Sequence, residues 1–254
     1  MLKTVNAFIL VYLLAPIIVV IATAFTTTAY PVFPPEGFTL RWFEKFLATP
    51  EFVESMKLSA LLATASTAIA AVLGTLSALA LTRFRIPGKA TISALLLSPI
   101  LFPTIVLGLA LLVFSNRIGI AGTFFNLVCA HVVLITPFVI RMVMVSLTHF
   151  DPAIEEAARN LGAGRLRTFF LITLPLIRPG VLAGAVFAFI LSFDELVVTL
   201  FLTAPGLQTL PIRIYTYVEY SSDPTISAIS TVLIAAWLLI GLPVYARFLS
   251  VHHP

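Results

Sequence analysis

Six long apolar runs, separated by short polar segments, dominate the pattern of the chain. A helix of about 20 mostly apolar residues crosses the ~30 Å hydrocarbon core of a bilayer. The runs cover approximately residues 7–29, 57–82, 90–114, 124–147, 181–204 and 226–249. The pattern therefore predicts an all-α integral membrane protein, with six transmembrane helices in one transmembrane domain over residues 1–254.

The first run also resembles a secretory signal, because Lys3 precedes it and Ala22-Thr23-Ala24 could be a cleavage site. Its length and the five runs that follow favour a first transmembrane helix. Within the third run, Pro99 and Pro103 predict either ordinary kinked packing or a bend in a helix that lines a path.

Two polar segments between the runs predict short helices at the membrane interface. Residues 30–55 contain FTLRWFEKFL, and residues 208–221 read LQTLPIRIYTYVEY. Aromatic side chains such as Trp42 suit the interfacial level of a bilayer. Asp223-Pro224 then supplies a helix cap followed by a proline at the first helical position, which predicts the start of the last helix.

The composition supports a membrane location. Charged residues are 10% of the 254 residues and the mean hydropathy is +1.09, whereas soluble domains have about 25% charged residues. The single cysteine, Cys129, excludes an internal disulfide framework.

The distribution of basic residues predicts the orientation. If the N-terminus is cytoplasmic, five of the fifteen Lys and Arg lie outside and ten lie inside. The short loop RFRIPGK at 83–89 is purely basic, which is typical of a cytoplasmic loop. Both termini and residues 151–180 are therefore expected in the cytoplasm. Because membrane insertion accounts for the basic charge, the net charge of +4 gives no support for nucleic-acid binding.

The segment 151–180 is polar enough to belong to a soluble protein. Asp151-Pro152 predicts a helix start, and Gly162 predicts its end in a left-handed conformation. One predicted face is apolar, with Ile154, Ala157, Ala158 and Leu161. The opposite face carries Glu155, Glu156, Arg159 and Asn160. A second helix is expected from Arg165, and Pro175 and Pro179-Gly180 are expected to turn the chain into the fifth span.

The apolar face of this predicted helix has two interpretations. A helix that lies on lipid normally presents Leu, Phe or Trp, with lysines on its polar side. The alanines here instead favour close approach by a protein surface, and docking on a soluble partner is the preferred interpretation.

The segment also carries a long motif. Glu156-Ala157-Ala158, Gly162 after three residues, and Ile172-Thr173-Leu174-Pro175 after nine more match E-A-A-x3-G-x9-I-x-L-P. This resembles the EAA loop of the permease subunits of bacterial binding-protein-dependent ABC importers, the type I or MetI-like group. The resemblance covers nearly the whole chain and implies a MetI-like fold in the bacterial inner membrane.

The resemblance implies a mechanism for the segment. In that family the EAA loop is a cytoplasmic coupling helix, which docks on an ATP-binding cassette ATPase subunit. The residues that would couple to the ATPase are Glu156, Ala157, Ala158, Arg159, Gly162, Leu174 and Pro175. The other implied partners are a second permease chain, expected to be a homologue, and an extracytoplasmic binding protein.

The chain itself carries no phosphate-binding loop of the form G-x4-G-K-[ST]. ATP and Mg²⁺ are therefore expected in the partner ATPase, and this chain is expected to have no cofactor, no catalytic residues and no metal site. His131, within the fourth run, is expected to be packed or hydrogen-bonded.

Two adjacent acids in the fifth run are the candidate substrate contacts. Asp194 and Glu195 lie roughly 20 Å along a predicted continuous helix, where a carboxylate must face a cavity or a partner. They could instead form an ion pair with another span or subunit. Phe193, Tyr215 and Tyr217 could add cation–π contacts to a cationic solute, although Phe193 could equally be ordinary packing.

The region from Ser192 to Thr231 resembles the spermidine/putrescine permease branch of the family. A multiply charged polyamine suits acids along a pathway. Ferric iron, aminoethylphosphonate or another small solute remains an alternative cargo. Two alternatives of another class are an ion-driven secondary carrier, which predicts internal repeats, and an intramembrane enzyme, which needs catalytic side chains in the spans.

Overall fold

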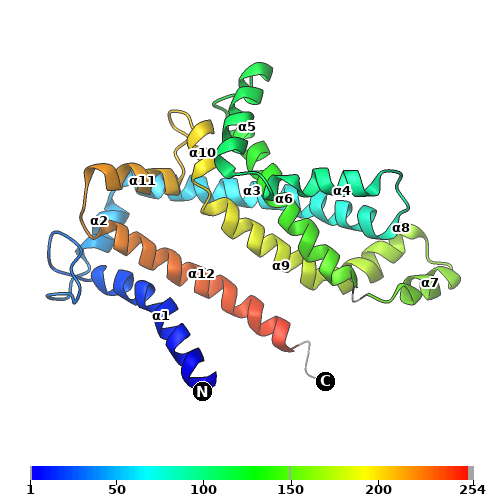
Figure 1. Cartoon of the computed structure of the whole chain (residues 1–254), viewed down its shortest axis with the longest axis horizontal. Helices are drawn as coiled ribbons and strands as arrows, with labels where there is room; N and C mark the ends of the chain where they lie inside the picture. The colour runs from blue at the N-terminus through cyan, green and yellow to red at the C-terminus, as the bar shows by residue number, and fades with distance from the viewer. Residues whose placement is uncertain (1, 149, 251–254) are drawn as a thin grey trace. The chain divides into compact units, whose positions relative to one another are not determined.

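The structure, a computed structural model, describes residues 2–148 and 150–250, without the side chains of 240 and 242–250. Every regular element within these ranges is helical, as Figure 1 shows. This confirms the all-α membrane fold. The helices form two compact units, one of residues 1–57 and 212–254 and the other of residues 58–211.

The first unit joins the two ends of the chain. Helix α1 (Leu2–Thr23) packs along α12 (Thr225–Ser250), and Thr23 Oγ1 donates to Ser227 Oγ at 3.1 Å. Both polar segments predicted to form short helices do so, as α2 (Arg41–Ala48) and α11 (Leu210–Tyr220), and their place at the membrane interface stays a prediction. The backbone N–H of Thr225 donates to Asp223 Oδ1 at 2.9 Å, which confirms the predicted cap of the last helix.

A polar cluster ties α2 to the start of α12 within this unit. Lys45 Nζ contacts both Asp223 Oδ2 and the Tyr217 hydroxyl, and the Tyr217 hydroxyl donates to Asp223 Oδ2 at 2.8 Å. Burial alone would raise the pKa of Asp223. Hydrogen bonds from Lys45, Thr225 and Tyr217 outweigh it and lower the pKa from 3.8 to about 2.

The second unit is built around three long helices. These are α3 (Pro50–Arg83), α6 (Phe124–Thr148) and α9 (Leu174–Phe193). Their buried core includes Ala78, Val139, Ile140, Val143 and Ile177. Helices α6 and α9 approach closely, because a Cβ on Gly180 would lie 2.4 Å from Ser146 Cβ.

The third predicted span is two helices with a sharp bend. Helix α4 (Lys89–Leu97) continues into the 3₁₀ turn η1 (Ser98–Ile100), and α5 (Thr104–Ile118) leaves at 103°. Pro99 lies in the turn and Pro103 caps α5, so the proline pair marks a sharp bend, which was one of the two interpretations left open. Helix α5 then packs against the short helix α10 (Val197–Leu202).

Among the described residues, four helices are long and apolar enough to cross a bilayer, or five if the bent pair counts as one span. They are Leu2–Thr23, Pro50–Arg83, Phe124–Thr148 and the continuous stretch Arg165–Phe193. The last apolar stretch, Thr225–Leu239, is shorter. The six-span topology therefore stays a prediction.

Candidate functional site: an exposed helix and a pocket at a helix break

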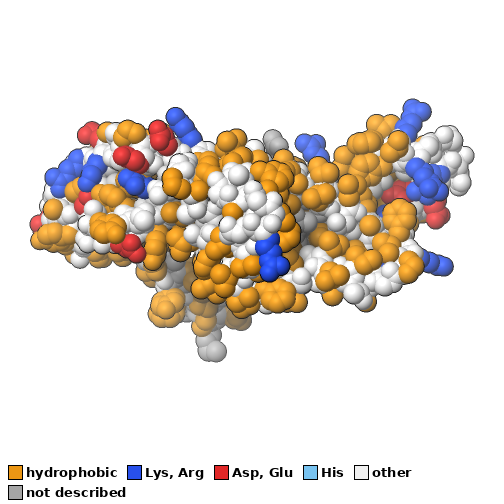
Figure 2. All heavy atoms as spheres, turned by 90° about the horizontal axis from the view of Figure 1, so that it is seen from above, with side chains coloured by type: hydrophobic (Ala, Val, Ile, Leu, Met, Phe, Trp, Pro, Cys, Tyr) orange, Lys and Arg blue, Asp and Glu red, His pale blue; other side chains and the backbone are white. Residues whose placement is uncertain are grey.

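The predicted polar-segment helix is present as α7 (Pro152–Asn160). Asp151 caps it, because its Oδ1 accepts the Ala153 N–H at 2.9 Å, and Pro152 occupies the first helical position. The apolar side of α7 is uncovered, with Ile154 44% and Leu161 90% exposed. Figure 2 shows acidic and basic side chains gathered at the end of the second unit where α7 and α8 lie.

The turn after α7 has a positive φ, a backbone conformation that glycine adopts without steric strain. Gly162 has φ +88°, and no atom lies within 4 Å of a Cβ built on it. The N–H of Ala163 donates to Ala158 O at 3.0 Å, and the N–H of Gly162 donates to Arg159 O at 2.9 Å. This pair of bonds is a Schellman motif, which satisfies the last carbonyls of the helix.

The three motif positions on α7 and the adjacent Arg159 are accessible in different degrees. Glu156, Ala157 and Arg159 are exposed, and Ala158 is half-buried. A carboxylate, a guanidinium and small apolar side chains are therefore presented together on one short helix. This surface can fit closely into a groove of another protein.

Glu155, predicted on the polar face of this helix, points toward the rest of the second unit. Its Oε1 accepts the Thr173 hydroxyl at 2.6 Å and lies 3.6 Å from Arg83 Nη2, while its Oε2 lies 3.8 Å from Arg159 Nη2. Hydrophobic periodicity separates polar from apolar faces. It does not reveal that Arg83 on α3 and Thr173 before α9 lie within reach of Glu155.

The predicted turn at Pro175 and Pro179-Gly180 is wrong. Helix α8 (Arg165–Thr168), the π-helical segment η2 (Phe169–Thr173) and α9 form one continuous helical stretch. The wider π turn falls just before Pro175, where the missing N–H would otherwise disturb the ladder. Leu174 packs against the core of α3, α6 and α9, whereas Pro175 is exposed.

The fifth predicted span, 181–204, is interrupted rather than continuous. Helix α9 ends at Phe193, and α10 begins at Val197. Glu195 Oε1 accepts the N–H of Val198 at 2.8 Å, so the carboxylate satisfies a backbone group that the break leaves free. The two acids therefore lie at a helix break, with Asp194 exposed on this chain and Glu195 half-buried.

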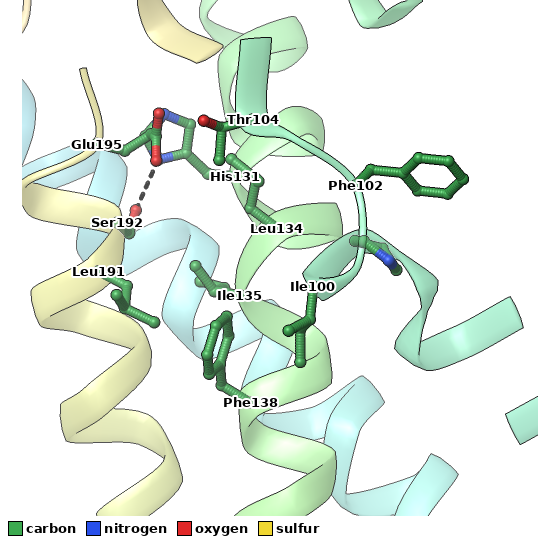
Figure 3. Close-up of a pocket in the computed structure, with 11 residues that line it drawn as sticks. Ile100, Phe102, Thr104, His131, Leu134, Ile135, Phe138, Leu191, Ser192 and Glu195 are labelled. Atoms are coloured by element: carbon green, nitrogen blue, oxygen red, sulfur yellow. Dashed lines mark hydrogen bonds between the residues drawn. The ribbon is translucent and has the colours of Figure 1, made fainter. Parts of the chain in front are cut away.

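A pocket of about 160 Å³ opens beside this break (Figure 3). Its polar wall comprises Glu195, Ser192, His131 and Thr104, and Phe102, Ile100, Leu134 and Phe138 are among its apolar walls. The pocket also touches Pro99, so the bent α4–α5 pair and the α9 break line the same cavity.

His131 belongs to a buried hydrogen-bonded chain, as expected. Its side chain is fully buried, with Nδ1 2.7 Å from Ser192 Oγ and Nε2 3.0 Å from Thr199 Oγ1. The Thr199 hydroxyl lies 3.0 Å from Glu195 O. Sequence reasoning missed Ser192 and Thr199, because the only signal was a lone histidine in an apolar run.

The remaining candidates lie elsewhere. Phe193 is 6% exposed, packs near Phe189, and is absent from the pocket lining. Tyr217 is engaged with Lys45 and Asp223, and Tyr215 is 44% exposed. Over the described residues, no three His, Cys, Asp or Glu side chains gather as a metal site would require.

Comparisons with solved structures support the fold. A bacterial ABC transporter involved in import of the acidic polysaccharide alginate superposes with a TM-score of 0.72 at 17% identity, covering 99% of this chain and 96% of the other. The inward-facing MetNI methionine ABC transporter gives a TM-score of 0.62 at 18% identity, covering 85% of this chain and 100% of the other.

Comparisons of sequence give the family. The spermidine/putrescine transport system permease protein PotC of Escherichia coli K12 is 34% identical over 228 residues, covering 90% of this chain and 86% of that protein. The putrescine permease PotI of the same strain is 32% identical, covering 91% of this chain and 84% of that protein. The molybdenum transport permease ModB of that strain is 34% identical over a smaller share, 64% of this chain and 78% of that protein.

The family model for the binding-protein-dependent transport system inner membrane component matches residues 70–249, which include α7, the Gly162 turn and the Glu195 pocket. These residues form most of the chain. The chain belongs to this family, and it is a permease subunit of an ABC importer rather than an enzyme.

Proposed function

We propose that this chain forms half of the pathway of a polyamine importer, with spermidine and putrescine as cargo. The observation that carries the proposal is the placement of Glu195 in a pocket formed at two interrupted helices. An interrupted membrane helix provides free backbone groups, and a carboxylate beside it provides charge, at the depth where solutes bind in many transporters.

The chemistry of the pocket suits a flexible alkyl amine. Glu195 supplies negative charge, and the hydroxyls of Ser192 and Thr104 can accept hydrogen bonds from an ammonium group. Phe138, Leu134 and Ile135 form an apolar wall against which a methylene chain can pack. Asp194, exposed on this chain, adds a second carboxylate one residue away.

The exposed surface of α7 supports a proposal about the ATPase partner. We infer that Glu156, Ala157, Ala158 and Arg159 dock on an ATP-binding cassette ATPase, which holds ATP and Mg²⁺. Gly162 shapes the turn behind the docking surface, and Leu174 and Pro175 lead into α9. A second, homologous permease chain and an extracytoplasmic binding protein complete the importer.

The orientation proposed is that both termini, the basic loop 83–89 and α7 face the cytoplasm of a bacterial inner membrane. The contact of Arg83 with Glu155 supports the last two placements, because it brings the end of α3 and α7 to the same side. ATP binding then favours an outward-facing state, and hydrolysis resets the cycle.

Another solute is the alternative within the same architecture. ModB is named for molybdenum transport, so the fold serves cargoes of different chemistry. An anion would be repelled by Glu195 and Asp194, which is the specific observation against it.

The test is uptake into cells that lack this chain, complemented with the unchanged chain or with Glu195→Gln. Labelled spermidine, putrescine and molybdate are the probes. The proposal predicts uptake of a polyamine, with a loss of roughly tenfold or more in Glu195→Gln, because an ionic hydrogen bond contributes about 1.5–3 kcal/mol. Restored molybdate uptake without polyamine uptake would contradict it.

A further inference from the structure

A compact polar cluster attaches α7 to the rest of the second unit. Arg83 is the last residue of α3, Glu155 lies in the first turn of α7, and Thr173 ends the π-helical segment that leads into α9. Glu155 accepts the Thr173 hydroxyl at 2.6 Å and pairs with Arg83 at 3.6 Å. Three separate parts of the chain therefore meet at one carboxylate.

The cluster is well shielded from solvent. The side chain of Glu155 is 13% exposed and that of Arg83 22%, while Thr173 is buried. The guanidinium of Arg83 also lies 4.5 Å from the centre of the Phe150 ring, on the segment that enters α7. Burying two charges is unfavourable unless they are paired, so each partner depends on the other for its position.

The rest of α7 is weakly held. No residue between Pro152 and Asn160, all of which are described, is fully buried. Its large apolar side chain, Ile154, remains 44% exposed. The carboxylate of Glu155 is therefore the principal polar attachment between α7 and the membrane helices behind it.

The motif that identifies the coupling loop fixes neither residue 155 nor residue 173. Glu156 is the motif glutamate and is exposed, whereas Glu155 precedes the motif and is turned inward. Thr173 occupies the unspecified position between Ile172 and Leu174. Two adjacent glutamates thus have different surroundings: Glu156 is exposed to solvent, and Glu155 contacts the end of α3 and the segment that leads into α9.

We propose that Arg83, Glu155 and Thr173 form an anchor, which transmits displacement of α7 to α3 and α9 during the transport cycle. The three are positioning residues that act through α7 and touch neither ATP nor solute. The inference rests on the proposed function, in which α7 docks on an ATPase. Without the anchor, α7 can move with the ATPase while the membrane helices stay in place.

The test uses the complete importer in vesicles, with Arg83→Gln, Glu155→Gln, the double variant and Thr173→Val. Arg85→Gln is the matched control, because Arg85 is exposed two residues after the end of α3. The measured quantity is ATP hydrolysed per labelled spermidine imported. Misfolding lowers both rates together, whereas a lost anchor raises the ratio by roughly two- to thirtyfold. The ATPase remains bound in every variant.

The double variant separates a shared contact from two independent defects. If Arg83 and Glu155 act through each other, the double variant raises the ratio no more than the larger single effect. A ratio unchanged within about twofold in both single variants, or effects that multiply, would overturn the anchor. Failure of the unchanged chain to retain an ATPase would overturn the proposed function itself, and the anchor with it.

A second readout does not depend on the identity of the solute. Spin labels on cysteines at Asn160 and Leu95, both exposed, report the distance between α7 and α4 in a Cys129→Ser chain. The anchor predicts one narrow distance distribution in the assembled importer, broadened by Glu155→Gln and unaffected by Arg85→Gln. An equally narrow distribution in Glu155→Gln would overturn it even if spermidine were not the cargo.

Discussion

Nδ1 of His131 lies 2.7 Å from Oγ of Ser192, so a buried hydrogen bond joins α6 to the last turn of α9. The bond holds the histidine beside the break that carries Glu195. Two sets of hydrogen bonds thus hold the polar groups of the break: those of His131, and that between Glu195 and the Val198 N–H.

Replacing His131 should destabilise the second unit. His131→Leu removes the histidine partner of Ser192 and Thr199, which we expect to lower the free energy of unfolding by about 1–3 kcal/mol. Thermal unfolding of the purified importer measures it. In the His131→Leu/Ser192→Ala pair, the loss should be smaller than the sum of the single losses. An additive pair would show that packing, rather than the hydrogen bond, accounts for the effect.

Substitutions of Gly162 should change local stability through backbone conformation and not through side-chain volume. Its φ is +88° and the space around it is open. Gly162→Ala should cost about 1–2 kcal/mol of local stability, and Gly162→Asn less, because Asn adopts left-handed conformations more readily. Hydrogen exchange of the 159–163 amides measures the local change. Equal exchange in both variants would exclude strain as the cause.

Substitutions of Gly180 should instead change stability through the volume of the added side chain. An added Cβ would meet Ser146 Cβ at 2.4 Å and Met142 O at 2.8 Å. Gly180→Ala should therefore separate α6 from α9 and destabilise the chain by about 1–3 kcal/mol. Gly241→Ala is the control, because no atom of the described residues lies within 4 Å of a Cβ built on Gly241. The account predicts a lower unfolding temperature for Gly180→Ala than for the control.

The Lys45–Asp223 contact should be insensitive to pH across the physiological range. The pKa of Asp223 is lowered to about 2, so its stabilising contribution is present above 3.8 and is lost as pH falls toward 2. The hydrogen bond to Asp223 raises the pKa of Lys45 above 10.5, so its contribution persists at neutral pH.

Trp42 provides the measurement, because its indole Nε1 donates to Thr26 O and Lys45 lies near its ring. In a Trp237→Phe chain, Trp42 fluorescence should stay constant from pH 9 to 5 and change between about pH 4 and 2. Asp223→Asn keeps the helix cap but removes the charge, so this acid transition should disappear. Its persistence in the variant would assign the transition to another group.

Local chemistry made α7 predictable. Asp151-Pro152 and Gly162 determine its two ends through backbone hydrogen bonding, and those rules need no tertiary information. The direction of Glu155 depends on Arg83, which lies 72 positions earlier and on another helix. No helical periodicity contains that pairing.

The break at Asp194 escaped prediction for a different reason. Hydropathy remains high through Val197–Leu202. The apolar run therefore continues across residues where the helical backbone is interrupted. The break is accompanied by one local contact, in which Glu195 satisfies the Val198 N–H, and by a tertiary contact, in which His131 bonds to Ser192 and Thr199. Composition measures transfer to lipid and carries no signal for such support.

The most direct test of the central claim is a cross-link from α7. A cysteine replaces Ala157 in a Cys129→Ser chain, a photoreactive thiol reagent is attached, and cross-linked products from native membranes are identified by mass spectrometry. The account predicts a product with an ATP-binding cassette ATPase, absent when the reagent sits at Leu95 on α4. Recovery of the chain alone, or labelling by lipid only, would contradict the docking of α7.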